Sequence, residues 1–244
     1  MEKSIREIEH DFFVKLRAEI HQAGKFVYRD GVVDEETWKS APVKMLFLLK
    51  DPVDPNCHED KSLLSFLRDG ANHERDRTWM NITRWVYSAL HCNETLSYSK
   101  DVKKMGTDLK KRKHYLRYIV AVNLKKHPGK STIPPARLIK VFQEYYKKWL
   151  PEQLGFYKDT DVIVCCGRGV RDCLVSVFEP TFGVPYNHKG WKNYHYEDVK
   201  VPYYQLPNGS MIIDYWHPSD WAHWSDRLKN NVFKSMIRDL VQNK

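Results

Sequence analysis

The sequence predicts an α/β fold: a three-layer sandwich with a central, mainly parallel sheet of four strands flanked by helices. Short apolar runs alternate along the chain with longer segments whose apolar residues recur at helical spacing. This alternation is typical of parallel sheets that carry helices on both faces. The chain contains no repeat and no low-complexity linker, so we expect a single domain over residues 1–244.

Apolar spacing and end signals predict the helices. Residues 4–22 carry apolar side chains at helical spacing, and Gly24 ends the pattern. This helix belongs to an N-terminal helical extension that we expect over about residues 1–40. Ser225 is a suitable N-cap for the last helix. The expected helices are residues 4–22, residues 78–90, a segment beginning at Pro134-Pro135, a segment from Gly167 to about Phe178, and the segment after Ser225.

Four short apolar runs predict the strands. The first is apolar on both faces, as expected of a buried strand in a parallel sheet. The runs are residues 43–49, 118–124, 161–166 and 211–216. Residues 186–196 differ, because aromatic side chains are interleaved there with lysine and histidine. This segment suits either a surface that stacks on nucleic-acid bases or a hairpin with one solvated face.

The charge of the chain suggests a polyanionic partner. The 244 residues include 40 Lys and Arg against 31 Asp and Glu, which gives a formal net charge of +9. A basic balance favours nucleic acid as the partner, although many proteins are mildly basic without one.

The cysteines and the apolar segments predict a cytoplasmic protein with no membrane partner. The five cysteines form no disulfide-scaffold pattern, which favours a reducing compartment. No apolar run approaches the length that crosses a bilayer, and the N-terminus has no signal-peptide core. We expect no metal, because Cys57-His58 and His91-Cys92 lack the spacing of zinc ligands.

Two short motifs follow predicted strands. Lys50-Asp51-Pro52 comes after residues 43–49, and His217-Pro218-Ser219 comes after residues 211–216. Side chains just past the carboxyl ends of parallel strands line the crevice of an open α/β fold. A carboxylate and an imidazole that meet there could together cleave a bond whose transition state carries positive charge on one side and negative charge on the other. The glycosidic bond of a nucleobase is such a bond.

These motifs resemble those of the uracil-DNA glycosylase superfamily. That family opens its site with a G-Q-D-P-Y-H type motif and closes it with H-P-S-P, which correspond here to residues 49–53 and 217–221. Residues 118–130 are similar to the family's base-reading strand and loop. Residues 164–168 are similar to its phosphate-holding strand and glycine turn. The resemblance spans residues 43–240 and implies a uracil-DNA glycosylase-like fold that needs no cofactor.

The resemblance implies a role for each matching residue. Asp51 is the expected catalytic carboxylate, which stabilises positive charge on the sugar and orients water. His217 donates a hydrogen bond to the oxygen of the leaving base. Asn123 reads the Watson–Crick edge of the base, unless Ala121 occupies that position, and Phe66 stacks on it. The ordinary alternatives are a turn aspartate, a structural histidine, a buried amide and a core aromatic.

Two departures from the family motif bear on the substrate. Val53, after Pro52, replaces a tyrosine that narrows the pocket of true uracil enzymes. We therefore expect Pro52 and Val53 to line a roomier base pocket, for uracil or for a bulkier modified cytosine. Lys50 replaces a glutamine, and its amine is a candidate nucleophile that would also nick the strand.

Several further residues are candidates for contact with DNA. Trp221 stands where the family carries an apolar wedge that fills the gap left by the extruded base. For each of the others, an ordinary solvated side chain is the alternative. The candidates are Ser219, Trp221, Arg168, Lys130, Ser131 and Lys189.

We therefore expect a monomeric DNA glycosylase that flips out one base and leaves an abasic site, in DNA repair or in defence against foreign modified DNA. The main alternative is a catalytically silent nucleic-acid-binding protein of the same fold. Another is a hydrolase of nucleotides or small nucleosides, which would bind long DNA weakly and with little salt dependence.

Overall fold

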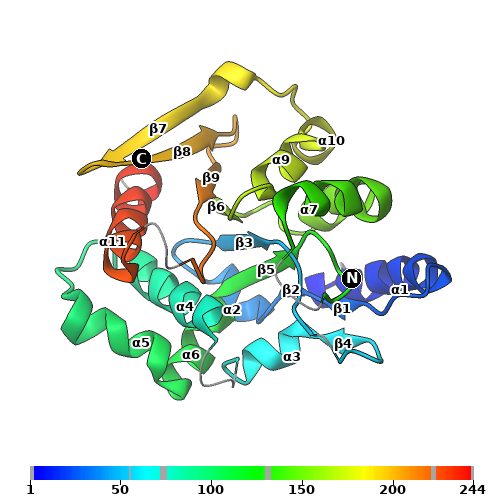
Figure 1. Ribbon diagram of the computed structural model, residues 1–244. Helices are drawn as coiled ribbons and strands as arrows, with labels where there is room; N and C mark the ends of the chain where they lie inside the picture. Colours follow the sequence, from blue (N-terminus) through cyan, green and yellow to red (C-terminus); the bar gives the residue numbers. More distant parts are fainter. Residues whose placement is uncertain (1–2, 55, 72–75, 130–132, 221–223, 243–244) are drawn as a thin grey trace.

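The computed structural model describes residues 3–54, 56–71, 76–129, 133–220 and 224–242. It has the α/β architecture that the sequence predicts, with helices on both sides of a mixed sheet (Figure 1). The strands are β1 (Tyr28–Arg29), β2 (Gly31–Val32), β3 (Met45–Leu49), β4 (Lys61–Ser62), β5 (Ile119–Asn123), β6 (Val162–Cys166), β7 (Trp191–Tyr196), β8 (Val199–Gln205) and β9 (Met211–Tyr215).

The main sheet has seven strands in the order β2-β5-β3-β6-β9-β8-β7. The four predicted strands are confirmed and form its parallel centre, β5-β3-β6-β9. The sheet extends beyond these four strands, because β2 pairs antiparallel with β5 and the β7–β8 hairpin pairs antiparallel with β9. Residues 186–196 thus supply one strand of a hairpin. A separate two-stranded sheet joins β1 to β4.

Serine side chains cap the first and the last helix, and the second of these caps is the predicted Ser225. The Ser4 side chain caps the first helix in a capping box with Glu7, and Ser225 caps the last one. The helices are α1 (Ile5–Gln22), α2 (Glu35–Lys39), α3 (Leu63–Arg68), α4 (Arg77–Leu90), α5 (Lys103–Thr107), α6 (Leu109–Tyr115), α7 (Pro135–Val141), α8 (Trp149–Gly155), α9 (Val170–Val175), α10 (Phe178–Phe182) and α11 (Asp226–Ile237). Single turns of π- or 3₁₀-helix lie at Tyr98–Val102, Leu116–Tyr118, Phe142–Tyr146, His188–Gly190 and Arg238–Gln242.

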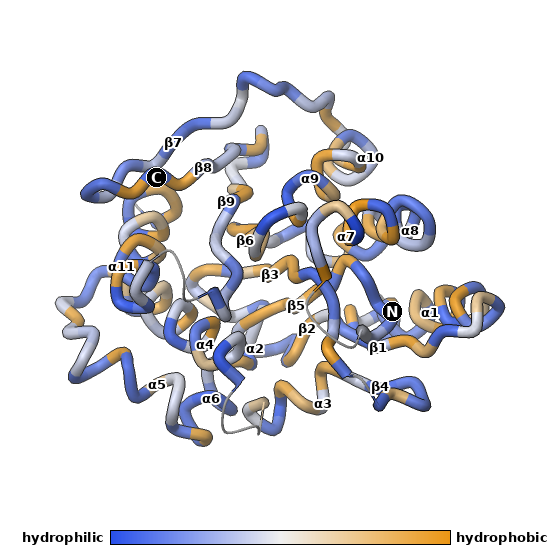
Figure 2. The backbone as a smooth tube through the Cα atoms, in the orientation of Figure 1, coloured by the Kyte–Doolittle hydropathy of each residue, from blue (hydrophilic) through white to orange (hydrophobic). Residues whose placement is uncertain are grey.

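Two apolar cores lie on opposite faces of the parallel strands. Side chains of a strand point alternately to its two faces, so Leu46 and Leu48 of β3 join the core under α1, α7, α8 and α9, whereas Met45 and Phe47 join the core under α3, α4 and α11. Figure 2 shows β3 and β5 as hydrophobic segments in the middle of the molecule. Burial on both faces explains why the sequence reveals these strands as continuous apolar runs.

The five cysteines are all free thiols, and four of them are buried. Among the described residues, no helix is long and apolar enough to cross a membrane.

Helix α1 is tied to the sheet by a buried carboxylate. Glu9 is fully buried, and its Oε1 accepts hydrogen bonds from the Val32 amide at 2.7 Å and from the Tyr157 hydroxyl at 2.5 Å. Among the described residues its Oε2 has no hydrogen-bond partner, although the Arg29 guanidinium lies 3.8 Å away. Burial raises the pKa of Glu9 to about 7 from its ordinary value of 4.5.

This raised pKa predicts a pH-dependent stability that Glu9→Gln should remove. The folded chain holds a proton that the unfolded chain releases near pH 4.5, so the free energy of unfolding falls as the pH rises from 4.5 through 7. The difference between the folded pKa of about 7 and the ordinary pKa of 4.5 corresponds to a loss of roughly 3 kcal/mol in the free energy of unfolding. Urea unfolding on both sides of this range should show that loss in the wild type and little of it in Glu9→Gln. An equal pH dependence in both proteins would contradict this account of Glu9.

Candidate active site

The loops that follow β3 and β5 run side by side. The Lys125 amide donates a hydrogen bond to the Lys50 carbonyl at 2.9 Å, and the Gly129 amide donates to the Pro52 carbonyl at 3.0 Å. The parallel register of β3 and β5 therefore continues past the ends of the strands. As a result, Lys125 lies beside Asp51, although the two residues are far apart in the sequence.

A cavity of about 780 Å³ opens at the carboxyl ends of the parallel strands. We call it the Asp51 cavity. It brings together the predicted catalytic pair, all four predicted base-binding residues and one predicted DNA contact, which come from three strand ends and from helix α3. These predicted residues are Asp51, Pro52, Val53, Phe66, Asn123, His217 and Ser219.

Asp51 is a buried carboxylate with a cationic partner. Its Oδ2 lies 3.1 Å from the Lys125 ammonium, and the two side chains are only 3% and 6% exposed, respectively. The Ile133 amide also donates a hydrogen bond to the carboxylate. Burial raises the pKa of Asp51 and lowers that of Lys125, because both charges have lost water, and the ion pair offsets part of each change. The ion pair thus favours an ionised carboxylate inside the cavity.

The hydrogen bonds of His217 fix its tautomer. Its Nδ1 accepts a hydrogen bond from the Ser219 amide at 3.3 Å and lies 2.8 Å from the Ser219 hydroxyl. A nitrogen that accepts from a backbone amide carries no proton, so the proton of the neutral ring is on Nε2. Burial, with a smaller effect of the Lys50 charge, lowers the pKa of His217 to about 4. At neutral pH the ring is therefore an uncharged donor through Nε2.

Asn123, at the end of β5, lines the Asp51 cavity. It is 3% exposed, and its backbone amide donates to the buried Asp30 carboxylate at 2.7 Å. Ala121, the alternative reader, is fully buried between the strands and lines neither this cavity nor the one described next. Phe66 of α3 lines the Asp51 cavity, and so does Val53, whose side chain is 57% exposed.

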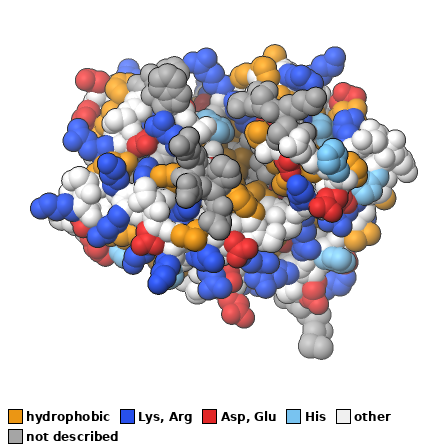
Figure 3. Space-filling view, turned by 60° about the horizontal axis from the view of Figure 1, so that its bottom comes forward, with side chains coloured by type: hydrophobic (Ala, Val, Ile, Leu, Met, Phe, Trp, Pro, Cys, Tyr) orange, Lys and Arg blue, Asp and Glu red, His pale blue; other side chains and the backbone are white. Residues whose placement is uncertain are grey.

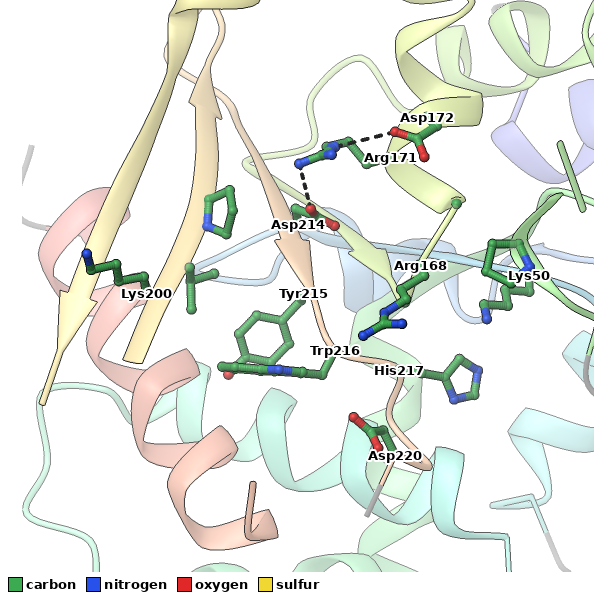
Figure 4. A pocket seen from close by; sticks show the side chains of 15 residues that line it. Lys50, Arg168, Arg171, Asp172, Lys200, Asp214, Tyr215, Trp216, His217 and Asp220 are labelled. Atoms are coloured by element: carbon green, nitrogen blue, oxygen red, sulfur yellow. Dashed lines mark ion pairs between the residues drawn. The ribbon is translucent and has the colours of Figure 1, made fainter. Parts of the chain in front are cut away.

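A second cavity of about 730 Å³, here called the Arg168 cavity, adjoins the first and shares Lys50 and His217 with it. Figure 4 shows the side chains of Lys50, Arg168 and His217 gathered at one end of it. The Arg171 guanidinium, which also lines this cavity, forms an ion pair with Asp214 at 2.9 Å (Figure 4). The guanidinium of Arg168, which has no hydrogen-bond or ion-pair partner within the described part of the chain, thus stands beside the catalytic candidates, where a phosphate could be held.

The turn after β6 requires glycine where it meets His217. Gly167 has a φ of +95°, and a Cβ atom there would lie 3.0 Å from the Cβ of His217 and 3.3 Å from the Cε of Lys50. Any larger residue would be strained and would push against both side chains. This close approach explains the glycine of the predicted phosphate-holding turn.

The remaining predicted DNA contacts lie elsewhere. Lys189 is exposed in the turn before β7 and lines neither cavity. Lys130, Ser131 and Trp221 lie outside the residues that the structure describes. Figure 3 shows one face of the molecule that is hollowed near its centre, with Lys and Arg side chains spread around the hollow.

Sequence reasoning missed Lys125 as the partner of Asp51. The signal was present, because Lys125 is two positions after Asn123 and so continues the same face of the extended chain. It also missed the buried Asp30, whose carboxylate holds the Asn123 amide and pairs with the Lys126 ammonium at 2.8 Å. Asp30 precedes the two-residue strand β2, which is too short to show a period.

No known family model matches the chain, and no curated protein matches it in sequence. Within the described ranges, no group of three or more His, Cys, Asp or Glu side chains is placed to hold a metal ion. The arrangement that remains is a buried carboxylate, a neutral imidazole donor and an amide around one cavity, beside a guanidinium.

Proposed function

We propose that this protein is a DNA glycosylase of the uracil-DNA glycosylase type, which hydrolyses the bond between a flipped-out pyrimidine-type base and its sugar. One observation carries the proposal: Asp51 and His217, 166 positions apart in the chain, line a single cavity together with Asn123 and Phe66. A carboxylate, a neutral donor, an amide and an aromatic ring are the groups that this reaction needs.

The chemistry follows from the charges of the two groups. As the glycosidic bond breaks, positive charge builds on the sugar and negative charge on the base. The Asp51 carboxylate stabilises the sugar cation and orients the water that adds to C1′. The Nε2–H of His217 donates to the base oxygen as it becomes negative, without a full proton transfer. Contacts of Arg168 with the DNA backbone would offset the cost of unstacking the base.

The Asp51 cavity has room for a base larger than uracil. Its 780 Å³ falls within the usual range for sites that enclose a small organic molecule, whereas a single pyrimidine ring fills only part of such a space. Val53 leaves open the wall where the family's tyrosine stands. We therefore favour a modified cytosine with a polar substituent, with uracil as the smaller candidate.

The test is a panel of oligonucleotides that contain uracil, hydroxymethylcytosine, glucosylated hydroxymethylcytosine or unmodified cytosine, each as single and double strands. After incubation and alkali treatment, strand breaks at the modified position mark abasic sites. The proposal expects breaks with at least one modified base and none with cytosine. Binding without breaks on every substrate would favour the catalytically silent module, and weak, salt-independent binding would favour a small-molecule hydrolase.

Val53→Tyr should narrow the cavity and change the preference among bases. The side chain of Val53 is largely exposed at the cavity wall, so a tyrosine fits without disturbing the core. We expect the ratio of excision rates, bulky base over uracil, to fall by at least about tenfold, since a clash in a pocket costs 1–3 kcal/mol. Val53→Ala is the matched control and should keep the ratio. An unchanged ratio in Val53→Tyr would show that this wall does not contact the substituent.

A further inference from the structure

Lys50 differs from Lys125 and Lys61, the two lysines that pair with carboxylates around the Asp51 cavity. Lys125 is paired with Asp51, and Lys61, which also lines the Asp51 cavity, lies 2.8 Å from Asp54. The Lys50 ammonium, in contrast, has no hydrogen-bond or ion-pair partner among the described residues, although it lines both cavities. An amine without a partner at the junction of the two cavities is available to a ligand.

The position of Lys50 is constrained by its neighbours. Its Cε atom lies close to the Gly167 turn, because a Cβ atom added to Gly167 would be only 3.3 Å from it. Figure 4 shows the Lys50 side chain beside His217 and Arg168. The backbone carbonyl of Lys50 is held by the Lys125 amide. Lys50 is thus fixed immediately before Asp51 in the chain and next to His217 in space.

The surroundings also favour the reactive form of the amine. Burial and the charge of Arg168 lower the pKa of Lys50, while the carboxylate of Asp51 opposes them. A lysine that is partly desolvated and close to another cation is the usual imine-forming nucleophile in enzymes.

We propose that Lys50 gives the protein a second activity, in which its amine forms an imine with C1′ of an abasic site and the DNA strand is cleaved by β-elimination. The inference rests on the proposed function in one respect, because an abasic site is the product of that reaction. The sugar of this product opens to an aldehyde at C1′, which is the electrophile that a neutral amine attacks.

The proposed reaction proceeds from an imine to strand cleavage in four steps. The lone pair of the Lys50 Nζ attacks the C1′ aldehyde, and loss of one water with uptake of one proton from solvent gives the protonated imine, which returns that proton when it is hydrolysed. The Asp51 carboxylate then takes a proton from C2′, the C3′–O bond breaks, and the 3′-phosphate leaves with the bonding electrons. One water hydrolyses the imine, which frees Lys50 and an unsaturated aldehyde. No electrons are gained or lost overall, so no oxidant or reductant is required.

The test uses DNA in which the abasic site is already present, so that it does not depend on base removal by this protein. The protein is mixed with the abasic oligonucleotide and sodium cyanoborohydride, which reduces an imine to a stable amine. The expected result is a covalent protein–DNA adduct, which peptide mass spectrometry locates on Lys50. An oligonucleotide with a tetrahydrofuran residue, which has no aldehyde, is the control and should give no adduct.

Variants provide an independent measurement. In Lys50→Gln and Lys50→Arg, adduct formation and strand cleavage should fall at least about tenfold, because neither side chain offers a neutral amine. Lys104→Gln, which removes an exposed lysine of helix α5 that lines neither cavity, should keep adduct formation and strand cleavage within about twofold. Thermal melting of each variant confirms folding. No adduct with the wild type, or an adduct that maps to another amine, would overturn the proposal, whether or not base release is observed in the oligonucleotide panel.

Discussion

Asp51→Asn should reduce the single-turnover rate of base release by roughly 10³-fold, whereas DNA affinity should change by only a few-fold. The amide has nearly the same shape as the carboxylate, but it carries no charge to stabilise a sugar cation and is a poor base for water. Since Asp51 lies inside the cavity, contacts with the DNA backbone do not depend on it. The measurement is release of the base that the oligonucleotide panel identifies, with affinity measured on the same oligonucleotide.

The buried ion pair makes a matched control necessary. Asp51→Asn leaves the Lys125 ammonium without its partner, which by itself destabilises the protein. Asp54→Asn also removes a lysine-paired carboxylate that lines the same cavity, with Lys61 as the partner at 2.8 Å. We expect Asp54→Asn to keep the rate within a few-fold. Equal losses in the two variants, or full activity in Asp51→Asn, would mean that Asp51 has only a structural role.

The wild-type rate should also fall on acidification at a pH above 3.8, the ordinary pKa of an aspartic acid. Burial raises the pKa of Asp51, so the carboxylate is protonated at a higher pH than an exposed one. The ionised form is the active one, and activity is therefore present above the raised pKa and lost as the pH falls through it.

His217→Ala should reduce base release by roughly 10²- to 10³-fold, the usual effect of removing one donor to a developing anion. Because burial holds the pKa of His217 at about 4, the ring is neutral over the whole range above that pH. We therefore expect no step in the wild-type rate near pH 6.5, where an exposed histidine would titrate. A step at that pH, lost in His217→Ala, would show that a charged imidazolium is the active form.

The matched control for His217 is a second half-buried histidine whose pKa is also lowered by burial. Burial lowers the pKa of His127 to about 3, and its Nδ1 lies 2.6 Å from the Tyr146 hydroxyl, yet it lines neither cavity. His127→Ala should keep base release within a few-fold after correction for folded protein. A loss as large as that in His217→Ala would show that the assay reports stability and not chemistry.

The parallel centre of the fold could be predicted because a strand that is buried on both faces is a continuous apolar run in the sequence. Strand β3 is apolar at every position, since Leu46 packs on one core and Phe47 on the other. The outer strands β2 and β8 have no such run. Strand β2 has two residues, and β8 carries Pro202 and exposes Lys200, so neither presents a continuous apolar run.

The candidate site was predictable to the extent that it sits at strand ends. Asp51 and His217 follow β3 and β9, whose carboxyl ends lie at one edge of the sheet, so the two motifs meet. The sequence alone left Asn123 and Ala121 as alternative readers, because that choice depends on which side chain reaches the cavity. The pairing of Lys125 with Asp51 depends on the register between two loops, which no local pattern encodes.

The most direct test of the central claim compares two abasic oligonucleotides that differ only in the charge of one sugar. One contains a pyrrolidine ring that is protonated at neutral pH, and the other contains a neutral tetrahydrofuran ring. If Asp51 stabilises a cationic sugar, the wild type should bind the pyrrolidine DNA at least about 100-fold more tightly, as enzymes do with transition-state analogues, and Asp51→Asn should lose this preference. Equal binding of the two oligonucleotides by the wild type would contradict the account.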